Sequence, residues 1–281
     1  MPIPWRTSRS ADQRAGQSLP TVPALADRAA NPRRGRKLTL PASLFCNMWH
    51  MDFASGRRRE AGHVVLLGDS IFDNGAYVDG GPDVISQLRE ELPGWTCSLL
   101  AVDGDVITGV ARQLGGLPAD ATHLVVSVGG NDALGYAPLL QERPDSVAEA
   151  LLLLGGARDR FDADYRAMLP AVLAQGLPAA VCTIYDTPPS EPNQKVIKAA
   201  LALFNDAITR AAFAAGAPLI DLRLICCDDE DYANPIEPSS RGGRKIAQAI
   251  ATLVRTTSPG PHSVVVGGAQ RESASSPNPA S

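Results

Sequence analysis

The sequence lacks several features that would assign it to a class at once. Of its 281 residues only 5% are aromatic, and no run of about 18 consecutive apolar residues occurs, so we expect no membrane association. It contains no Walker glycine loop, no G-x-G-x-x-G and no H-E-x-x-H motif. Nucleotide and zinc binding therefore lack support, and we expect neither a cofactor nor a metal.

Cysteines are also few. The chain has five, an odd number without C-x-x-C spacing, and no compact apolar segment of a secretory signal is visible. A reduced, cytoplasmic setting fits this pattern best. The cysteines are Cys46, Cys97, Cys182, Cys226 and Cys227.

Charge is unevenly spread along the chain. Residues 1–62 carry eleven basic and four acidic side chains, a net of +7, and the whole chain has a net charge of −4, which leaves −11 for the remainder. An acidic body is a poor surface for nucleic acid, so no nucleic-acid partner is expected. Residues 1–62 are interpreted as a basic, disordered N-terminal extension. A targeting arm, or a true start at Met48 or Met51, is the alternative.

From residue 63 onward, short apolar runs alternate with helical stretches. The runs are continuous and not alternating, which is typical of parallel strands that are buried on both faces. Helical periodicity follows in between, as at residues 197–211 and 246–254, and Pro170 is expected to split or end a helix. The five expected strands are His63–Leu67, Thr96–Val102, Leu124–Val128, Ala179–Tyr185 and Pro218–Leu222.

This order of elements predicts one α/β domain over residues 63–257, with about five parallel strands and helices on both faces, in three layers. Residues 258–281 are rich in Ser, Pro, Gly and Ala and are expected to be a disordered tail. Nothing in the sequence fixes the oligomeric state.

The residues that follow three of these strands carry chemistry. The first strand is followed by Gly68-Asp69-Ser70, the second by Asp103-Gly104 and the third by Gly129-Gly130-Asn131-Asp132. Because ligands bind at the carboxyl ends of parallel strands, we expect these residues to converge. Ser70, at the start of a helix, offers a nucleophilic hydroxyl and an N–H, while Gly104 and Asn131 add further donors. A nucleophile beside an oxyanion hole is what acyl transfer requires.

These blocks resemble the GDSL-type esterases, the SGNH hydrolase family. The resemblance covers residues 63–257 and implies a flavodoxin-like three-layer fold. It also implies that Ser70 is the nucleophile and that Ser70, Gly104 and Asn131 form the oxyanion hole. Asp69 and Asp132 adjoin these groups and are candidate substrate-binding residues, although helix capping and turn hydrogen bonds explain them equally well.

The closing segment departs from the family pattern. The family ends in Asp-x-x-His, where His is the base and Asp orients it, but in this chain Asn234 and Glu237 occupy the matching positions. In one interpretation the Glu237 carboxylate takes the Ser70 proton directly, which requires burial to raise its pKa toward 7. In the other, base function has been lost and the fold survives as a binding module or weak hydrolase.

No histidine is expected to replace the missing base. His63 and His123 begin strands and are therefore expected some 17 Å from the catalytic edge, while His50 and His262 lie in the segments interpreted as disordered. The run Asp228 to Asp231 is interpreted as solvated surface, with a cation site as the alternative. Gly135–Gly156 is expected to form part of the cleft wall or a cap.

The sequence therefore predicts a serine esterase that cleaves a small acyl ester through a Ser70 acyl-enzyme, with Glu237 as an atypical base. The alternatives are an impaired module that binds an acylated or carbohydrate ligand in the same cleft, and an acyltransferase. Sequence alone does not separate hydrolysis from transfer, because both share the acyl-enzyme.

Overall fold

The computed structural model describes residues 61–256 and 265–266. These residues form a parallel sheet in the order β2-β1-β3-β4-β5-β8, with helices on both faces. The first five strands have the doubly wound order 2-1-3-4-5, so the fold class expected from the sequence is confirmed. The strands are β1 (His63–Gly68), β2 (Thr96–Leu99), β3 (His123–Ser127), β4 (Ala179–Cys182), β5 (Leu219–Ile220) and β8 (Val265–Val266).

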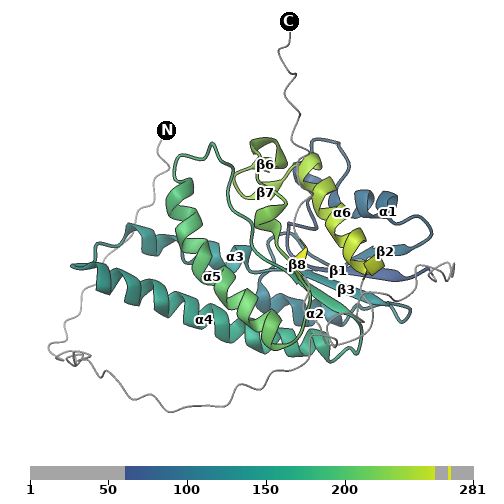
Figure 1. Cartoon of the computed structure of the whole chain (residues 1–281), viewed down its shortest axis with the longest axis horizontal. Helices are drawn as coiled ribbons and strands as arrows, with labels where there is room; N and C mark the ends of the chain where they lie inside the picture. The colour runs from purple at the N-terminus through teal and green to yellow at the C-terminus, as the bar shows by residue number, and fades with distance from the viewer. Residues whose placement is uncertain (1–60, 257–264, 267–281) are drawn as a thin grey trace, which may run out of the picture. The chain divides into compact units, whose positions relative to one another are not determined.

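The helices divide between the two faces of the sheet. Figure 1 shows α1 and α6 on one side and α2, α4 and α5 on the other. Strand β1 faces both layers: Val64 and Leu66 pack with α1 and α6, while Val65 and Leu67 pack with α2, α4 and α5. The helices are α1 (Val84–Glu91), α2 (Val110–Leu114), α3 (Gly130–Gly135), α4 (Val147–Leu173), α5 (Gln194–Ala214) and α6 (Ser240–Thr256).

Short elements complete the part of the chain that the structure describes. An antiparallel hairpin of β6 (Tyr232–Asn234) and β7 (Glu237–Pro238) precedes α6. The 3₁₀ segments are η2 (Gly75–Tyr77), η3 (Ile107–Gly109), η4 (Ala137–Gln141), η5 (Leu222–Leu224) and η6 (Asp229–Asp231). None of the helices described is long and apolar enough to span a bilayer.

Three local expectations from the sequence differ from the structure. Helix α4 continues through Pro170 to Leu173, because the proline lies within one turn of the helix end and its neighbours Leu169 and Val172 are buried. At Ser70, where a helix was expected to start, the chain makes only a single turn. The first α-helix begins at Val84. A sixth strand, β8, pairs with β5 in the stretch that was expected to be tail.

The topology fixes where a site can lie. Strand β1 is paired with β2 on one side and β3 on the other, so the chain winds in opposite directions from β1. At such a switch point the loops after the two central strands leave a crevice at the carboxyl ends. Ser70 follows β1 and Asn131 follows β3, so both lie at this crevice.

Candidate active site

Ser70 and Glu237 meet although 167 residues separate them. The Ser70 hydroxyl donates a hydrogen bond of 3.0 Å to Oε1 of Glu237. Both side chains are buried, with 6% and 4% of their surface exposed. A hydroxyl that donates directly to a buried carboxylate has its proton acceptor in place.

The turn after β1 places Ser70. The carbonyl oxygen of Asp69 accepts hydrogen bonds from the N–H groups of Phe72 and Asp73, which closes one turn. Gly68 has a φ of +127°, and a Cβ there would collide with the backbone oxygen of Ser127. Only glycine allows this close approach of β1 to β3.

Three hydrogen bonds from two other segments hold the loop that carries Glu237. The Tyr185 hydroxyl donates to the carbonyl oxygen of Ile236 at 2.9 Å, and the Thr187 hydroxyl donates to that of Pro235 at 3.1 Å. On the other side, Nδ2 of Asn74 donates to the carbonyl oxygen of Pro238 at 3.1 Å. The backbone on both sides of Glu237 is therefore fixed to the domain.

The environment of Glu237 favours its neutral form. Burial raises the pKa of its carboxyl to about 7, the nearby Asp103 carboxylate adds to this effect, and the hydrogen bond from Ser70 opposes it. Its second oxygen, Oε2, is buried and has no hydrogen-bond partner within the described part of the chain. An unpaired buried carboxylate is a stronger base than a solvated one, because its charge is poorly solvated.

Asn234 pairs with Glu237 through the backbone of the β6–β7 hairpin, but its side chain is not hydrogen-bonded to the Glu237 carboxylate. Its side-chain oxygen accepts from the N–H of Ile236 at 2.9 Å, within the two-residue hairpin loop. This is an Asx turn, which shapes the loop itself. The carboxylate therefore depends for its orientation on Ser70 and on the anchored backbone.

The described histidines have other contacts. The ring of His63, at the opposite end of β1 from Ser70, bonds to Asp120 and Ser98 at 3.0 and 2.8 Å. His123 begins β3, and its Nδ1 lies 2.9 Å from the Thr122 hydroxyl. His50 and His262 lie outside the described residues.

The candidate oxyanion donors come from two further loops. Gly104 has a φ of +78° in a turn closed by a hydrogen bond from the Asp105 N–H to the Val102 carbonyl oxygen. A type II turn requires such a residue at its third position. Asn131, in α3, donates one Nδ2 hydrogen bond to the Asp105 carbonyl oxygen at 2.8 Å, so the Gly104 turn and Asn131 are tied together.

The two candidate substrate-binding aspartates both accept backbone hydrogen bonds. Asp69 accepts from the N–H of Ile71 at 3.1 Å and lines the main cavity, whereas Asp132 accepts from the N–H of Ile107 at 3.0 Å. Burial raises the pKa of Asp69 to about 8, and the Glu237 and Asp132 carboxylates add to this rise. Burial also raises the pKa of Asp132.

The buried Asp69 gives a prediction for stability. Its pKa rises from 3.8 in the unfolded chain to about 8 in the folded one, so folding favours the protonated form, and the stability contributed by that form is lost progressively as pH rises from 3.8 to about 8. Asp69→Asn keeps a neutral side chain at every pH. We expect it to stabilise the protein by at most about 4 kcal/mol at pH 7, and by little at pH 4.

Urea unfolding of both proteins between pH 4 and 9 measures this gain. Asp145→Asn, at an exposed position, serves as the control for a general effect of removing one negative charge. A gain for Asp69→Asn that does not change with pH would contradict the burial of a neutral carboxyl.

A cavity of about 520 Å³ opens at the Ser70–Glu237 pair. Ser70, Asn131 and Glu237 all line it, together with Tyr185 and Thr187. Its other walls come from α3, η4, α4 and α5 and are largely apolar. The expected wall segment 135–156 contributes Leu140 and Leu154, while Leu151, Leu152 and Leu153 are exposed.

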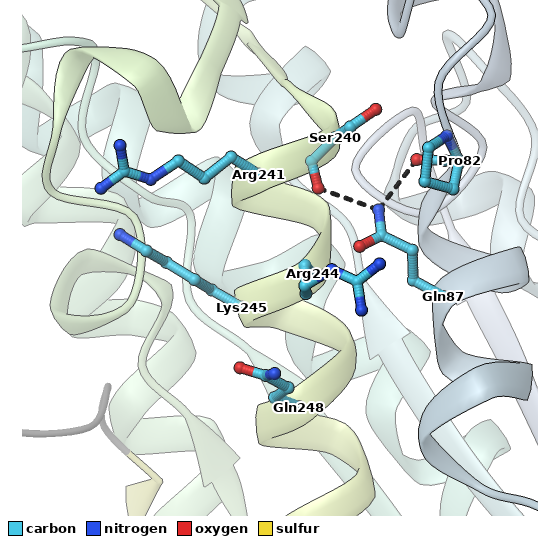
Figure 2. Close-up of a pocket in the computed structure, with 7 residues that line it drawn as sticks. All are labelled: Pro82, Gln87, Ser240, Arg241, Arg244, Lys245 and Gln248. Carbon is cyan, nitrogen blue, oxygen red and sulfur yellow. Dashed lines mark hydrogen bonds between the residues drawn. The ribbon is translucent and has the colours of Figure 1, made fainter.

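A second, shallower pocket of about 380 Å³ lies between α1 and α6. Figure 2 shows Gln87 there, whose Nε2 donates to the carbonyl oxygens of Pro82 and Ser240, at 2.8 and 2.9 Å. Arg241 and Lys245 also line this pocket, and their side chains point away from Gln87 (Figure 2). Arg241 pairs with Asp228 and Glu230, and Lys245 pairs with Asp231. Because Ser240 follows β7 closely, this contact fixes the start of α6 beside the loop of Glu237.

The acidic run contains a group that could hold a cation. Ligand atoms of Cys227, Asp228 and Asp231 lie within 4.8 Å of one another. However, Lys245 already bonds to Asp231 at 2.6 Å, and the same carboxylate accepts the N–H groups of Cys227 and Asp228. These contacts give Asp231 a role in closing the η6 turn.

Sequence reasoning found the pair at the centre of the site and missed the residues that position it. Tyr185, Thr187 and Asn74 belong to no motif, and their contacts join segments about 50 to 160 residues apart. The only signal was the placement of Tyr185 and Thr187 just after the fourth strand, at the edge where the site was expected.

Comparisons with known proteins bear on the family and on the fold. Residues 66–245 match the profile of the GDSL-like Lipase/Acylhydrolase family. No curated protein matches the sequence.

Solved structures resemble the fold at low sequence identity. An extracellular lipase from Streptomyces rimosus is 18% identical over 70% of this chain and 100% of its own, with a TM-score of 0.53. Phospholipase A1 from Streptomyces albidoflavus is 18% identical over 70% of this chain and 100% of its own, with a TM-score of 0.51. A lipase from a goat rumen metagenome is 16% identical over 71% of this chain and 99% of its own, with a TM-score of 0.55.

Proposed function

The chain belongs to the GDSL-like lipase/acylhydrolase family, and from this premise we propose that it is a serine ester hydrolase whose general base is Glu237. The family supports hydrolysis of an ester. The finer assignment rests on one observation, the hydrogen bond from the Ser70 hydroxyl to the buried Glu237 carboxylate.

In the first half of the reaction, Oγ of Ser70 attacks the ester carbonyl carbon while Oε1 of Glu237 takes the hydroxyl proton. The developing oxyanion is stabilised by the N–H groups of Ser70 and Gly104 and by Nδ2 of Asn131. When the tetrahedral intermediate collapses, the bond to the alcohol oxygen breaks. Glu237 returns the proton to that oxygen, which leaves an acyl-enzyme and a free alcohol.

The second half releases the acid. Glu237 takes a proton from a water molecule, the water oxygen attacks the acyl carbon, and collapse of the second intermediate returns the proton to Ser70. No metal or organic cofactor is required. The same acyl-enzyme would transfer its acyl group if another hydroxyl replaced water.

Hydrolysis of p-nitrophenyl acetate and butyrate between pH 5 and 9 tests the proposal. Because Glu237 acts in its ionised form and burial raises its pKa to about 7, kcat/KM should rise with pH through about 7 and level off above it. A wild-type rate no greater than that of Ser70→Ala at every pH would refute the hydrolase and favour a binding module in the same cleft.

Tyr185 gives a second prediction, as a positioning residue. Tyr185→Phe removes the hydrogen bond to the Ile236 carbonyl oxygen and frees the loop of Glu237. We expect kcat to fall about 10-fold to 100-fold, because a catalytic group displaced by ~1 Å loses about that much rate.

The pH profile separates this role from a structural one. KM for acetate should stay within a few-fold, and the midpoint of the acid limb should move as the carboxylate changes its surroundings. Tyr232→Phe is the matched control. The Tyr232 ring packs edge-on against the Tyr185 ring, but its hydroxyl donates to the carbonyl oxygen of Cys226 and not to the loop of Glu237. Equal effects of the two substitutions on kcat would argue against a specific role for Tyr185.

A further inference from the structure

The first turns of α4 carry an apolar face that the domain does not bury. Along α4 the buried side chains begin at Ala157, whereas Leu151 and Leu152 before it are 60% and 70% exposed. With about 100° of rotation per residue, five small or apolar residues at the spacing i, i+3, i+4, i+7 and i+8 share one face of the helix. We call this face the outer stripe: Ala148, Leu151, Leu152, Gly155 and Gly156.

The two glycines of the outer stripe have no packing reason within the described part of the chain. A Cβ at Gly155 or at Gly156 would meet nothing within 4 Å, and neither residue has a positive φ. Glycine is nevertheless, after proline, the least favourable residue in the interior of a helix. Its advantage is that another backbone or side chain can approach closely. Two adjacent glycines on an unburied helix face therefore favour a partner from outside the described fold.

The outer stripe is complementary to itself. Leu151 and Leu152 protrude from it, and Gly155 and Gly156 form a hollow one turn further along. When two such stripes pack antiparallel about a two-fold axis, their residues meet in reverse order, so the leucines of each copy lie over the glycines of the other. An interface between identical chains requires a self-complementary patch, and side chains that fit into holes of the facing helix provide it. A lipid surface would also take up the leucines but would have no use for the hollow.

We propose that the outer stripe of α4 packs against the same stripe of a second copy of this chain. The stripe spans about 14 Å of helix, and the neighbouring Val147, which is 78% exposed, widens it. An apolar patch of this kind lies at the lower end of what an interface needs, about 500 Å² from each copy, so the dimer is reversible, with a Kd on the order of 10 μM. None of the five residues lines the main cavity, so the proposal does not depend on the proposed function.

The first test is the mass of the full-length protein by sedimentation velocity, at concentrations between about 0.1 and 100 μM. The mass should rise from that of one chain, 29.5 kDa, toward twice that value as the concentration increases. A single chain at every concentration would overturn the proposal. A single chain that binds phosphatidylcholine vesicles through the stripe would overturn it as well, because the occupant would then be a lipid surface.

The second test places a charge in the centre of the outer stripe. Leu152→Glu should raise the Kd of the dimer at least about 100-fold, because the interface would bury an unpaired carboxylate. Leu224→Glu is the matched control, since Leu224 of η5 is 56% exposed and lies outside the stripe. It should leave the Kd within about threefold. A wild-type Kd in Leu152→Glu would mean that another surface carries the dimer, which contradicts the proposal.

The third test separates a fitted hollow from a surface that is merely apolar. Gly155→Leu adds apolar area in open space, so the single chain should unfold at the same temperature as the wild type or higher. The added side chain fills the hollow that the leucines of the other copy need, so we expect the Kd to rise at least about 10-fold. An unchanged or lower Kd would refute the packing of leucine onto glycine. None of these measurements requires esterase activity, so failure of the proposed function leaves them valid.

Discussion

Replacing Glu237 by glutamine should lower kcat for p-nitrophenyl butyrate by about 10³-fold to 10⁴-fold, the contribution of a well-placed general base. The amide of glutamine has almost the same shape as the carboxylate and can still accept a hydrogen bond from Ser70. It cannot take the proton, so Ser70 stays a neutral hydroxyl and a weak nucleophile.

Two further variants make this result specific. Ser70→Ala should lose at least as much activity, and the double variant Ser70→Ala with Glu237→Gln should lose no more than Ser70→Ala alone, because residues that act as a unit are not additive. Glu237→Gln also removes a buried ionisable group, so its unfolding should be no easier than that of the wild type above pH 7. A fall in kcat of less than about fivefold for Glu237→Gln would contradict a role as base.

Removing the amide of Asn131 should have the next largest effect. Asn131→Ala is expected to lower kcat by about 10²-fold to 10³-fold with KM changed only a few-fold, because an oxyanion donor acts mainly when charge develops in the transition state. The measurement is kcat and KM for butyrate hydrolysis at pH 8, where Glu237 is ionised.

The structural role of Asn131 needs its own control. One of its Nδ2 hydrogen atoms is used in the hydrogen bond to the Asp105 carbonyl oxygen, so its loss also loosens the Gly104 turn. Arg112→Ala loosens the same turn by another route, since Arg112 pairs with Asp105 at 2.8 Å and touches no part of the cavity. If Arg112→Ala costs as much rate as Asn131→Ala, the effect comes from the turn and not from a missing donor.

The strands and the catalytic edge could be predicted because their signals are local. Buried parallel strands appear as continuous apolar runs, and the residues at 68–70 and 129–131 follow two of them directly, so topology alone brings them to one crevice. The same alignment of motifs put Glu237 in the position of the base. The structure places its carboxylate 3.0 Å from the Ser70 hydroxyl.

The features that were not predicted depend on contacts between residues far apart in the sequence, which no local pattern indicates. A proline predicts the end of a helix, but burial of Leu169 and Val172 outweighs the lost hydrogen bond at Pro170. A serine after a strand predicts a helix start, yet the chain turns once and leaves for η2. Tyr185 donates to the Ile236 carbonyl oxygen although 51 residues separate them in the sequence. No periodicity or motif spacing predicts a contact over such a separation.

Activation of Ser70 by Glu237 can be measured by covalent labelling of the full-length protein with a fluorophosphonate between pH 5 and 9, followed by mass spectrometry. We expect one adduct, on Ser70, with a labelling rate that rises through pH 7, and a rate at least about 10²-fold lower in Glu237→Gln. Absence of an adduct across this range, or equal labelling of wild type and Glu237→Gln, would contradict activation by Glu237.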